Sequence, residues 1–309
     1  MLFRSQSLRQ LALAISNSNH DRTSDTRESF KFLQECNTTL GSAIAGTYGT
    51  LLIDRSTFEN MHAGVMSQWD TGRATVTISR SQFKHMGLGV ESSNTNVIVG
   101  PGTTFLAVDH PIEAIGGDAS IDDSTFKSGG SSTFTRYPAP AWRGVLATVP
   151  CSLSVKNTNF VDNQQGSPSL GTWAIPEDQR GGGALFTECN TAFENVQFLR
   201  NHGTRGGAVA IGAGATTVSV KKGWFWENTA ALDGGALVVV RSSSSHAEER
   251  LTLKLRYVYF TGNRAKNTGG AISDSVGGTN VIDAGAVAFQ KNTSDIGAGM
   301  YWLGPLRIV

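Results

Sequence analysis

The stretch that decides the fold is VSVKKGWFWEN at residues 218–228, followed by GGAL at 234–237. Valines alternate with polar residues ahead of Phe225, an Asn stands three residues after it, and a glycine pair then precedes Ala and Leu. Alternation with a period of two residues predicts a β-strand with one buried face, and paired glycines indicate a tight turn. The stretch therefore describes one strand-and-turn unit.

The same unit recurs along the chain when the sequence is aligned on phenylalanine. The aligned residues, 25 to 43 positions apart, are Phe58, Phe83, Phe126, Phe160, Phe198, Phe225, Phe260 and Phe289. An Asn follows at the third position in five copies, at Asn163, Asn201, Asn228, Asn263 and Asn292. A weaker ninth copy, NVIVGPGTTF at 96–105, lies in the largest gap and is expected to be out of register. Repeats of 20–50 residues are typical of solenoids.

Each part of the unit has a physical task. Alternating strands stack in parallel, and their phenylalanines form an internal column. Asn tolerates the left-handed backbone of a sharp turn, and its amide can bond the Asn of the next coil. Glycine allows positive φ and close backbone approach, and the Ala after each pair fits a narrow interior.

The sequence thus predicts an all-β chain folded as a right-handed parallel β-helix, a single-stranded solenoid of the pectin-lyase-like kind. Roughly nine coils about 4.8 Å apart would form a rod about 45 Å long. Helical solenoids fit worse because the 3.6-residue period is absent, and a propeller fits worse because most repeats are too short for four antiparallel strands.

Two regions are expected. Residues 1–29 form a polar N-terminal segment, in which Leu8, Leu11, Ala12 and Ile15 fall on one face of a short helix that could cap the solenoid. Residues 30–309 form the β-helix. No stretch approaches the ~20 apolar residues of a membrane span, so no transmembrane segment is predicted. With 26 Lys and Arg against 25 Asp and Glu, no nucleic-acid partner is expected.

The cysteines form no Cys-x-x-Cys pair and lie far apart, at Cys36, Cys151 and Cys189. One bridge with one free thiol fits the sequence, but three buried small side chains are the preferred interpretation. No metal site and no cofactor are predicted, because the glycine-rich segments belong to the repeat and contain no nucleotide-binding fingerprint.

Gly-Gly-Ala-[Ile/Val/Leu] combined with Phe-x-x-Asn resembles the repeats of the chlamydial polymorphic membrane proteins. The resemblance is strongest from Leu153 to Met300 and weaker from Leu51 to Phe126. It implies a β-helical, surface-exposed module that acts in adhesion, located at the cell surface or outside the cell. The chain stops soon after its last repeat, and we expect it to be part of a longer protein.

Carboxylate pairs are the first candidates for chemistry, because β-helical enzymes that act on polysaccharides need clustered acids. Asp122-Asp123 is the only adjacent aspartate pair, and it occupies a turn position of the repeat. A solvated turn is therefore the simpler interpretation. The histidines that follow phenylalanines, His62, His85 and His202, are placed near one edge of the rod but belong to coils that are not all adjacent.

Two insertions hold the residues predicted to bind a ligand. Residues 129–150 contain Tyr137, Trp142 and Arg143, and residues 164–181 contain Trp173. Exposed aromatic rings beside charged groups suit sugar stacking or a protein contact, whereas packing of these rings against the rod is the simpler interpretation.

Two functions follow. The first is a non-catalytic surface or extracellular module that binds a glycan or a cell-surface protein. The alternative is a polysaccharide-active lyase, hydrolase or epimerase. One observation is expected to distinguish the two functions. Three or more charged residues from neighbouring coils that converge on one exposed face would favour the enzyme, and a scattered distribution would favour the non-catalytic module.

Overall fold

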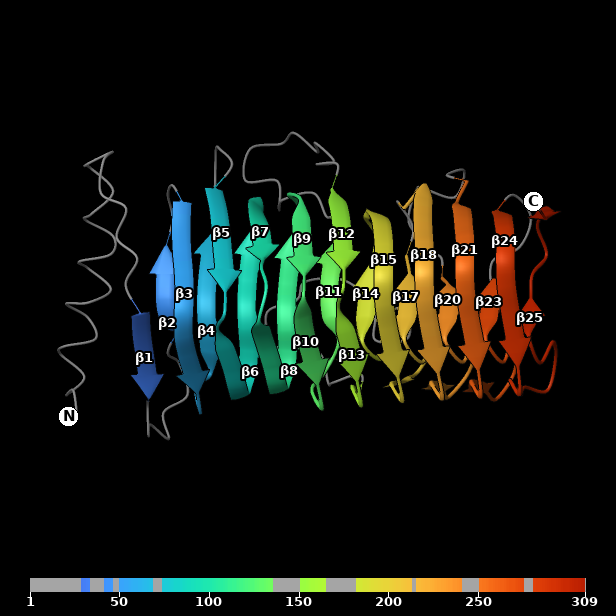
Figure 1. Ribbon diagram of the computed structural model, residues 1–309, viewed down its shortest axis with the longest axis horizontal. Coiled ribbons are helices and arrows are strands. Elements are labelled where there is room, and N and C mark those ends of the chain that lie inside the picture. Colours follow the sequence, from blue (N-terminus) through green and yellow to red (C-terminus); the bar gives the residue numbers. More distant parts are fainter. Residues whose placement is uncertain are drawn as a thin grey trace, which may run out of the picture.

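The computed structural model describes residues 29–33, 42–46, 50–68, 74–135, 151–164, 182–212, 215–240, 250–274 and 280–308. These residues form one rod of stacked coils (Figure 1). All pairings between the described strands are parallel, in one 23-stranded and one 3-stranded sheet. In Figure 1 the long strands run downward at the front and the chain returns behind them while advancing from left to right, so the coil is right-handed. The predicted parallel β-helix is confirmed.

The C-terminal half has the most regular coils. Long strands carry the aligned phenylalanines, and two kinds of short strand complete each turn. The long strands are β15 (Asn190–Leu199), β18 (Thr217–Trp226), β21 (Thr252–Thr261) and β24 (Val281–Gln290). The short strands are β14 (Leu185–Thr187), β16 (His202–Gly203), β17 (Val209–Ile211), β19 (Thr229–Ala230), β20 (Leu237–Val239), β22 (Arg264–Ala265), β23 (Ile272–Asp274), β25 (Met300–Tyr301) and β26 (Leu306–Ile308).

The N-terminal half has the same winding with less regular strand lengths. Its strands are β1 (Ser29–Leu33), β2 (Ser42–Gly46), β3 (Thr50–Glu59), β4 (Ala63–Gln68), β5 (Ala74–Ser79), β6 (Gln82–Ser93), β7 (Thr95–Val99), β8 (Thr103–Ile115), β9 (Ala119–Asp122), β10 (Ser124–Lys127), β11 (Ser132–Thr135), β12 (Ser152–Lys156) and β13 (Asn159–Val161). The predicted capping helix within residues 1–29 lies outside the described residues.

The core is a continuous column of phenylalanine rings. From Phe58 to Phe289, neighbouring rings lie 4.7–5.2 Å apart and nearly parallel. Phe105 belongs to this column, 4.8 Å from Phe83 and 4.7 Å from Phe126. The expectation that the ninth copy is out of register is therefore wrong. Its extra residue is absorbed in the turn that contains Gly102, at φ +72°, so Val99 still pairs with Ile78.

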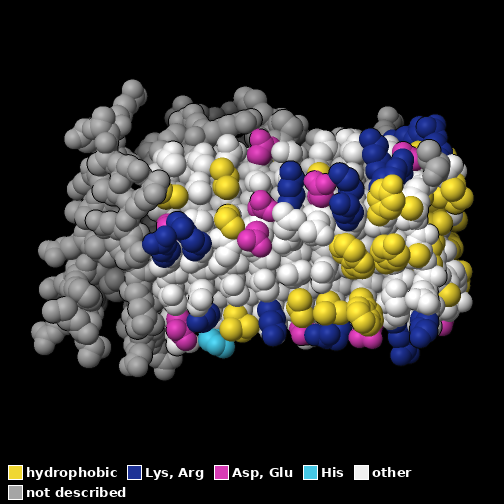
Figure 2. Space-filling view, viewed as in Figure 1, with side chains coloured by type: hydrophobic (Ala, Val, Ile, Leu, Met, Phe, Trp, Pro, Cys, Tyr) yellow, Lys and Arg dark blue, Asp and Glu magenta, His cyan; other side chains and the backbone are white. Residues whose placement is uncertain are grey.

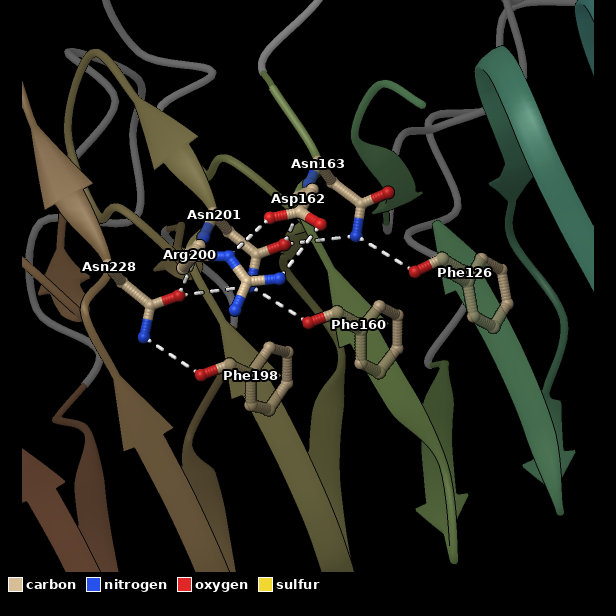
Figure 3. A network of polar contacts seen from close by, with 8 residues as sticks. All are labelled: Phe126, Phe160, Asp162, Asn163, Phe198, Arg200, Asn201 and Asn228. Atoms are coloured by element: carbon tan, nitrogen blue, oxygen red, sulfur yellow. Dashed lines mark hydrogen bonds and ion pairs between the residues drawn. The ribbon is translucent and has the colours of Figure 1, made fainter. Parts of the chain in front are cut away.

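The repeated asparagines form a buried ladder beside the Phe column (Figure 3). The side-chain nitrogen of Asn201 donates to the Asn228 side-chain oxygen at 2.9 Å and to the Phe160 carbonyl at 3.0 Å. The predicted bonds between coils are thus present, but the prediction that Asn takes up the left-handed turn is wrong. The residue just before it does so, for example Arg200 at φ 52° and Glu227 at φ 53°. The reason is spatial: the Asn side chain points inward to the ladder, whereas the turn residue points to solvent.

The glycine pairs act as predicted. The first glycine has positive φ in three of the pairs, at 68° for Gly206, 64° for Gly234 and 61° for Gly269. The second approaches the next coil so closely that a Cβ on Gly235 would lie 2.0 Å from the Gly270 carbonyl oxygen. Any side chain there would collide with backbone, which explains why the position is glycine.

A disulfide joins Cys151 to Cys189, with their Cα atoms 5.0 Å apart. The preference for three free, buried cysteines is therefore wrong for this pair. Ser152 pairs with Asn190 in the β12–β15 register, so the residues just before them face each other one coil apart. A separation of 38 residues is distant along the chain but adjacent in a solenoid. Cys36 lies outside the described residues.

Candidate functional site

Four exposed aromatic side chains from two neighbouring strands form what we call the aromatic patch: Trp224 and Trp226 of β18, and Tyr257 and Tyr259 of β21. Their exposed fractions are 39%, 54%, 58% and 48%. Figure 2 shows hydrophobic side chains gathered on the part of this face where β18 and β21 lie, with basic side chains beside them. Such a cluster is unusual, because large aromatic residues are highly buried on average.

Strand alternation places these rings on the outside. Phe225 and Phe260 point into the core and are almost completely buried, so the residues flanking them point outward. The register pairs Trp224 with Tyr259, and their rings lie 6.4 Å apart at an interplanar angle of 10°. The rigid Phe column thus positions the outer rings as well as the core.

Tyr257 occupies a backbone conformation that rarely suits an aromatic residue. Its φ is 57°, in a turn column that holds Asn157, Asn195 and Lys222 in the preceding coils. Left-handed backbone costs a non-glycine residue about 1 kcal/mol or more, and Asn is among the residues that tolerate it best. A Tyr that is also 58% exposed contributes little core packing in return. The same turn column has positive φ from Arg55 to Ala286, so the repeat imposes this conformation, and the large exposed ring is what distinguishes Tyr257 from the other residues of the column.

One edge of the patch is basic. We call the side chains of Lys221, Lys222, Lys254 and Arg256 the basic edge. Lys221 donates to Glu194 at 2.8 Å, and Arg256 forms an ion pair with Asp283 at 2.9 Å. Lys222 and Lys254 are exposed, and among the described residues neither has an ion-pair partner. Four basic groups against two acidic ones leave a local charge of about +2.

Charged residues of neighbouring coils do meet here, but their arrangement does not suit acid–base catalysis. Lys156, Glu194 and Lys221 occupy one column of paired positions. The hydrogen bond from Lys221 holds the pKa of Glu194 below its ordinary value. A general acid needs a raised pKa, so Glu194 is ionised and acts as an ion-pair partner.

The opposite edge carries a neutral pair. Arg200 of one coil donates to Asp162 of the preceding coil at 2.7 and 3.0 Å (Figure 3). This hydrogen bond lowers the pKa of Asp162 and raises that of Arg200. The two turn residues therefore neutralise each other. Exposed Glu227 and Lys291, which belong to the same turn column, add one charge of each sign at this edge.

The ligand-binding residues predicted from the sequence, Tyr137, Trp142, Arg143 and Trp173, lie outside the described residues. Their role remains a prediction.

The other candidates have structural roles. Asp122 accepts a hydrogen bond from Asn157, and Asp123 forms the left-handed turn at φ 44°. His85 is likewise a turn residue at φ 49°, and His202 bonds the Thr229 hydroxyl at 2.7 Å. Over the part of the chain with described coordinates, no group of three His, Cys, Asp or Glu side chains is placed to hold a metal ion.

Sequence reasoning missed the aromatic patch because its residues were absorbed into the repeat. A signal was nevertheless present at the positions just before and after each aligned Phe. These outward positions hold Thr57 and Glu59 around Phe58, and other copies have Gln-Phe-Lys or Thr-Phe-Lys. Trp224-Phe-Trp226 departs sharply from that polar pattern.

These features define a class of protein: a β-helical module of stacked coils with an exposed aromatic cluster on its side. Residues 257–275, a segment that begins at Tyr257 of the patch, match the sequence model of one protein family. This family is described as the Chlamydia polymorphic membrane protein (Chlamydia_PMP) repeat. The chain thus contains this repeat, and the resemblance inferred from the sequence is confirmed. No curated protein and no solved structure matches the chain.

The repeat and the fold together indicate a module of a surface protein. In the part of the chain that the structure describes, there is no helix with the length and apolar character needed to cross a membrane.

Proposed function

We propose that this chain is a non-catalytic extracellular module that binds a glycan or a protein on a cell surface through the aromatic patch. At about 200 Å² per aromatic side chain, the four exposed fractions correspond to about 400 Å² of aromatic surface. The largest apolar patch on a monomer is typically 300–600 Å² and is often functional. The aromatic patch is the observation that carries the proposal.

The Cys151–Cys189 disulfide supports the extracellular location. Disulfides persist in oxidising environments such as the cell exterior and are rare where thiols are kept reduced. The proposed location therefore has support from the fold itself as well as from the repeat family.

Binding of the purified 309-residue chain to cultured epithelial cells tests the proposal. The variant Trp224→Ala/Tyr259→Ala is expected to lose at least tenfold in binding. A matched control, Gln82→Ala/Thr104→Ala, changes two outward positions that pair across β6 and β8 in the same columns of the rod. Equal binding by both variants and the parent would overturn the assignment to this patch.

The aromatic residues of the two insertions remain a second proposed contact. A Trp142→Ala/Trp173→Ala variant tests them in the same assay. Loss of binding in that variant, with full binding by the patch variant, would move the site to the insertions.

Polysaccharide cleavage is the alternative function, and one observation favours it. Glu91 of β6 and Glu113 of β8 are paired in register on neighbouring coils. Burial raises the pKa of Glu91, as a general acid requires. However, Glu113 is only 5% exposed, which limits access for a polymer. Release of oligosaccharides from pectin or xylan by the parent chain, lost in Glu91→Gln, would establish this alternative.

A further inference from the structure

The outer face of β21 and β24 contains a step that the inner face lacks. Inside the rod, Phe260 stacks on Phe289 of the next coil at 5.2 Å. Outside, on the same two strands, Tyr259 pairs in register with Ala288. Tyr257 likewise lies opposite Ala286, because the residues on either side of them pair in register. Each tyrosine is therefore followed by an alanine, and the place of the next ring is left open.

We call the open place above Ala288, beside the Tyr259 ring, the step. The spacing of the phenylalanine rings inside the rod shows what size of ring fits there. Two six-membered rings stack at the spacing of these coils inside the rod, so a ligand ring above Ala288 can stack on Tyr259 in the same way. The two faces of the Tyr259 ring differ. One face is covered by Trp224, with the ring centroids 6.4 Å apart, and the other face borders the step. A planar or chair-shaped ring with an apolar face would thus extend the Trp224–Tyr259 stack by one member.

The basic edge restricts the chemistry of this ligand. Lys222 lies in the column of Tyr257 one coil earlier, and Lys254 lies five residues before Tyr259 on β21. Five residues of strand span at most about 17 Å. A ligand that reaches both the step and the free lysines is therefore longer than one sugar ring and carries negative charge.

The size of the patch separates a saccharide from a protein partner. A standard protein interface buries about 800 Å² on each partner, roughly twice the exposed aromatic surface estimated above. An oligosaccharide needs less contact area, because each of its rings offers an apolar face to an aromatic side chain and polar groups at its edge.

From this geometry we propose that the aromatic patch and the basic edge bind an acidic oligosaccharide, with one pyranose ring stacked on Tyr259 above Ala288 and a carboxylate or sulfate group paired with Lys222 or Lys254. This inference rests on the proposed function, since it names the ligand class of the same patch.

Isothermal titration of the full chain tests the inference with three probes: a size-defined heparin hexasaccharide, a galacturonic acid hexasaccharide, and the neutral methyl ester of that galacturonic acid hexasaccharide. At least one acidic hexasaccharide is expected to bind, at least tenfold more tightly than the neutral methyl ester. Its affinity is expected to fall as salt concentration rises, because exposed charges are screened.

Variants separate ring stacking from attraction to any polyanion. Tyr259→Ala removes the ring on which the ligand stacks, and Ala288→Phe fills the step, so each is expected to weaken binding at least tenfold. Ala288→Ser leaves the step open and is the matched control, expected to bind within twofold of the parent. Lys222→Ala/Lys254→Ala is expected to weaken binding about tenfold and to remove most of the salt dependence.

Three results would overturn the inference: no binding of either acidic probe, equal binding of the neutral methyl ester, or unchanged binding by Tyr259→Ala and Ala288→Phe. The proposed function fails separately. Patch-dependent binding to cells that persists after enzymatic removal of acidic glycans would retain the proposed function and identify a protein partner instead.

Discussion

Replacing Asn228 with alanine removes the middle of the asparagine ladder. The Asn228 side-chain oxygen accepts from the Asn201 backbone and side-chain nitrogens at 3.0 and 2.9 Å. Its side-chain nitrogen donates to the Phe198 carbonyl and to Asn263, each at 3.0 Å. At about 1 kcal/mol net for each hydrogen bond, the four bonds contribute about 4 kcal/mol.

The consequence of this change is larger than for a surface residue, because Asn228 is completely buried. The backbone N–H of Asn201 loses the partner described above, and water cannot replace it without opening the coil. Unsatisfied buried donors cost about 1–3 kcal/mol each. We therefore expect Asn228→Ala to lower the free energy of unfolding by 3–5 kcal/mol.

Urea unfolding followed by circular dichroism and by tryptophan fluorescence measures this loss. Two tryptophans of the same coil, Trp224 and Trp226, report on it directly. Thr229→Ala is the control, since its hydroxyl bonds only the exposed His202 ring among the described residues, and it is expected to change stability by less than about 0.5 kcal/mol. A loss below about 1 kcal/mol for Asn228→Ala would refute the additive reasoning.

Three further predictions concern other parts of the rod. Cys151→Ala/Cys189→Ala is expected to lower stability by up to about 4 kcal/mol, the chain-entropy estimate for a 38-residue loop, as read from urea unfolding, with a steeper slope because the unfolded chain without the cross-link exposes more surface. Gly235→Ala is expected to prevent soluble expression or to cost more than about 3 kcal/mol, because its Cβ would lie 2.0 Å from a backbone carbonyl; an unchanged melting temperature would contradict this. Asp162 has a lowered pKa when folded, so its contribution is present above the unfolded value and is lost as pH falls through the folded value. Because both partners of the Arg200 pair are more than one-third exposed, this contribution is expected to stay below about 0.5 kcal/mol, and Asp162→Asn should flatten the acid limb of a pH–stability curve only slightly.

Sequence periodicity predicted most of the fold because each coil repeats the same physical solution. A Phe at a fixed place in an alternating strand can only point inward, and its copies must then stack. The extra residue before Phe105 misled the alignment, because counting positions cannot show that a turn absorbs an insertion while the strand register is kept.

The disulfide and the site were harder to predict for a common reason: both depend on which residues meet across coils. Cys151 and Cys189 become neighbours only once the exact pairing of β12 with β15 is known. Trp224 and Tyr259 are 35 positions apart in the sequence, and their contact likewise follows from the register of β18 with β21. The strained backbone of Tyr257 is visible only in the structure.

The stack of phenylalanines also determines how the aromatic patch can bind. Trp224 and Tyr259 are each attached to strands whose next residue is locked in that stack, at ring spacings of 4.8 and 5.2 Å. The backbone beneath the outer rings is thus already ordered before any ligand arrives. Binding then orders only side chains with two rotatable bonds each, so little conformational entropy is lost on association. A modest contact area can consequently give useful affinity, and several such coils in tandem would multiply that affinity without new chemistry.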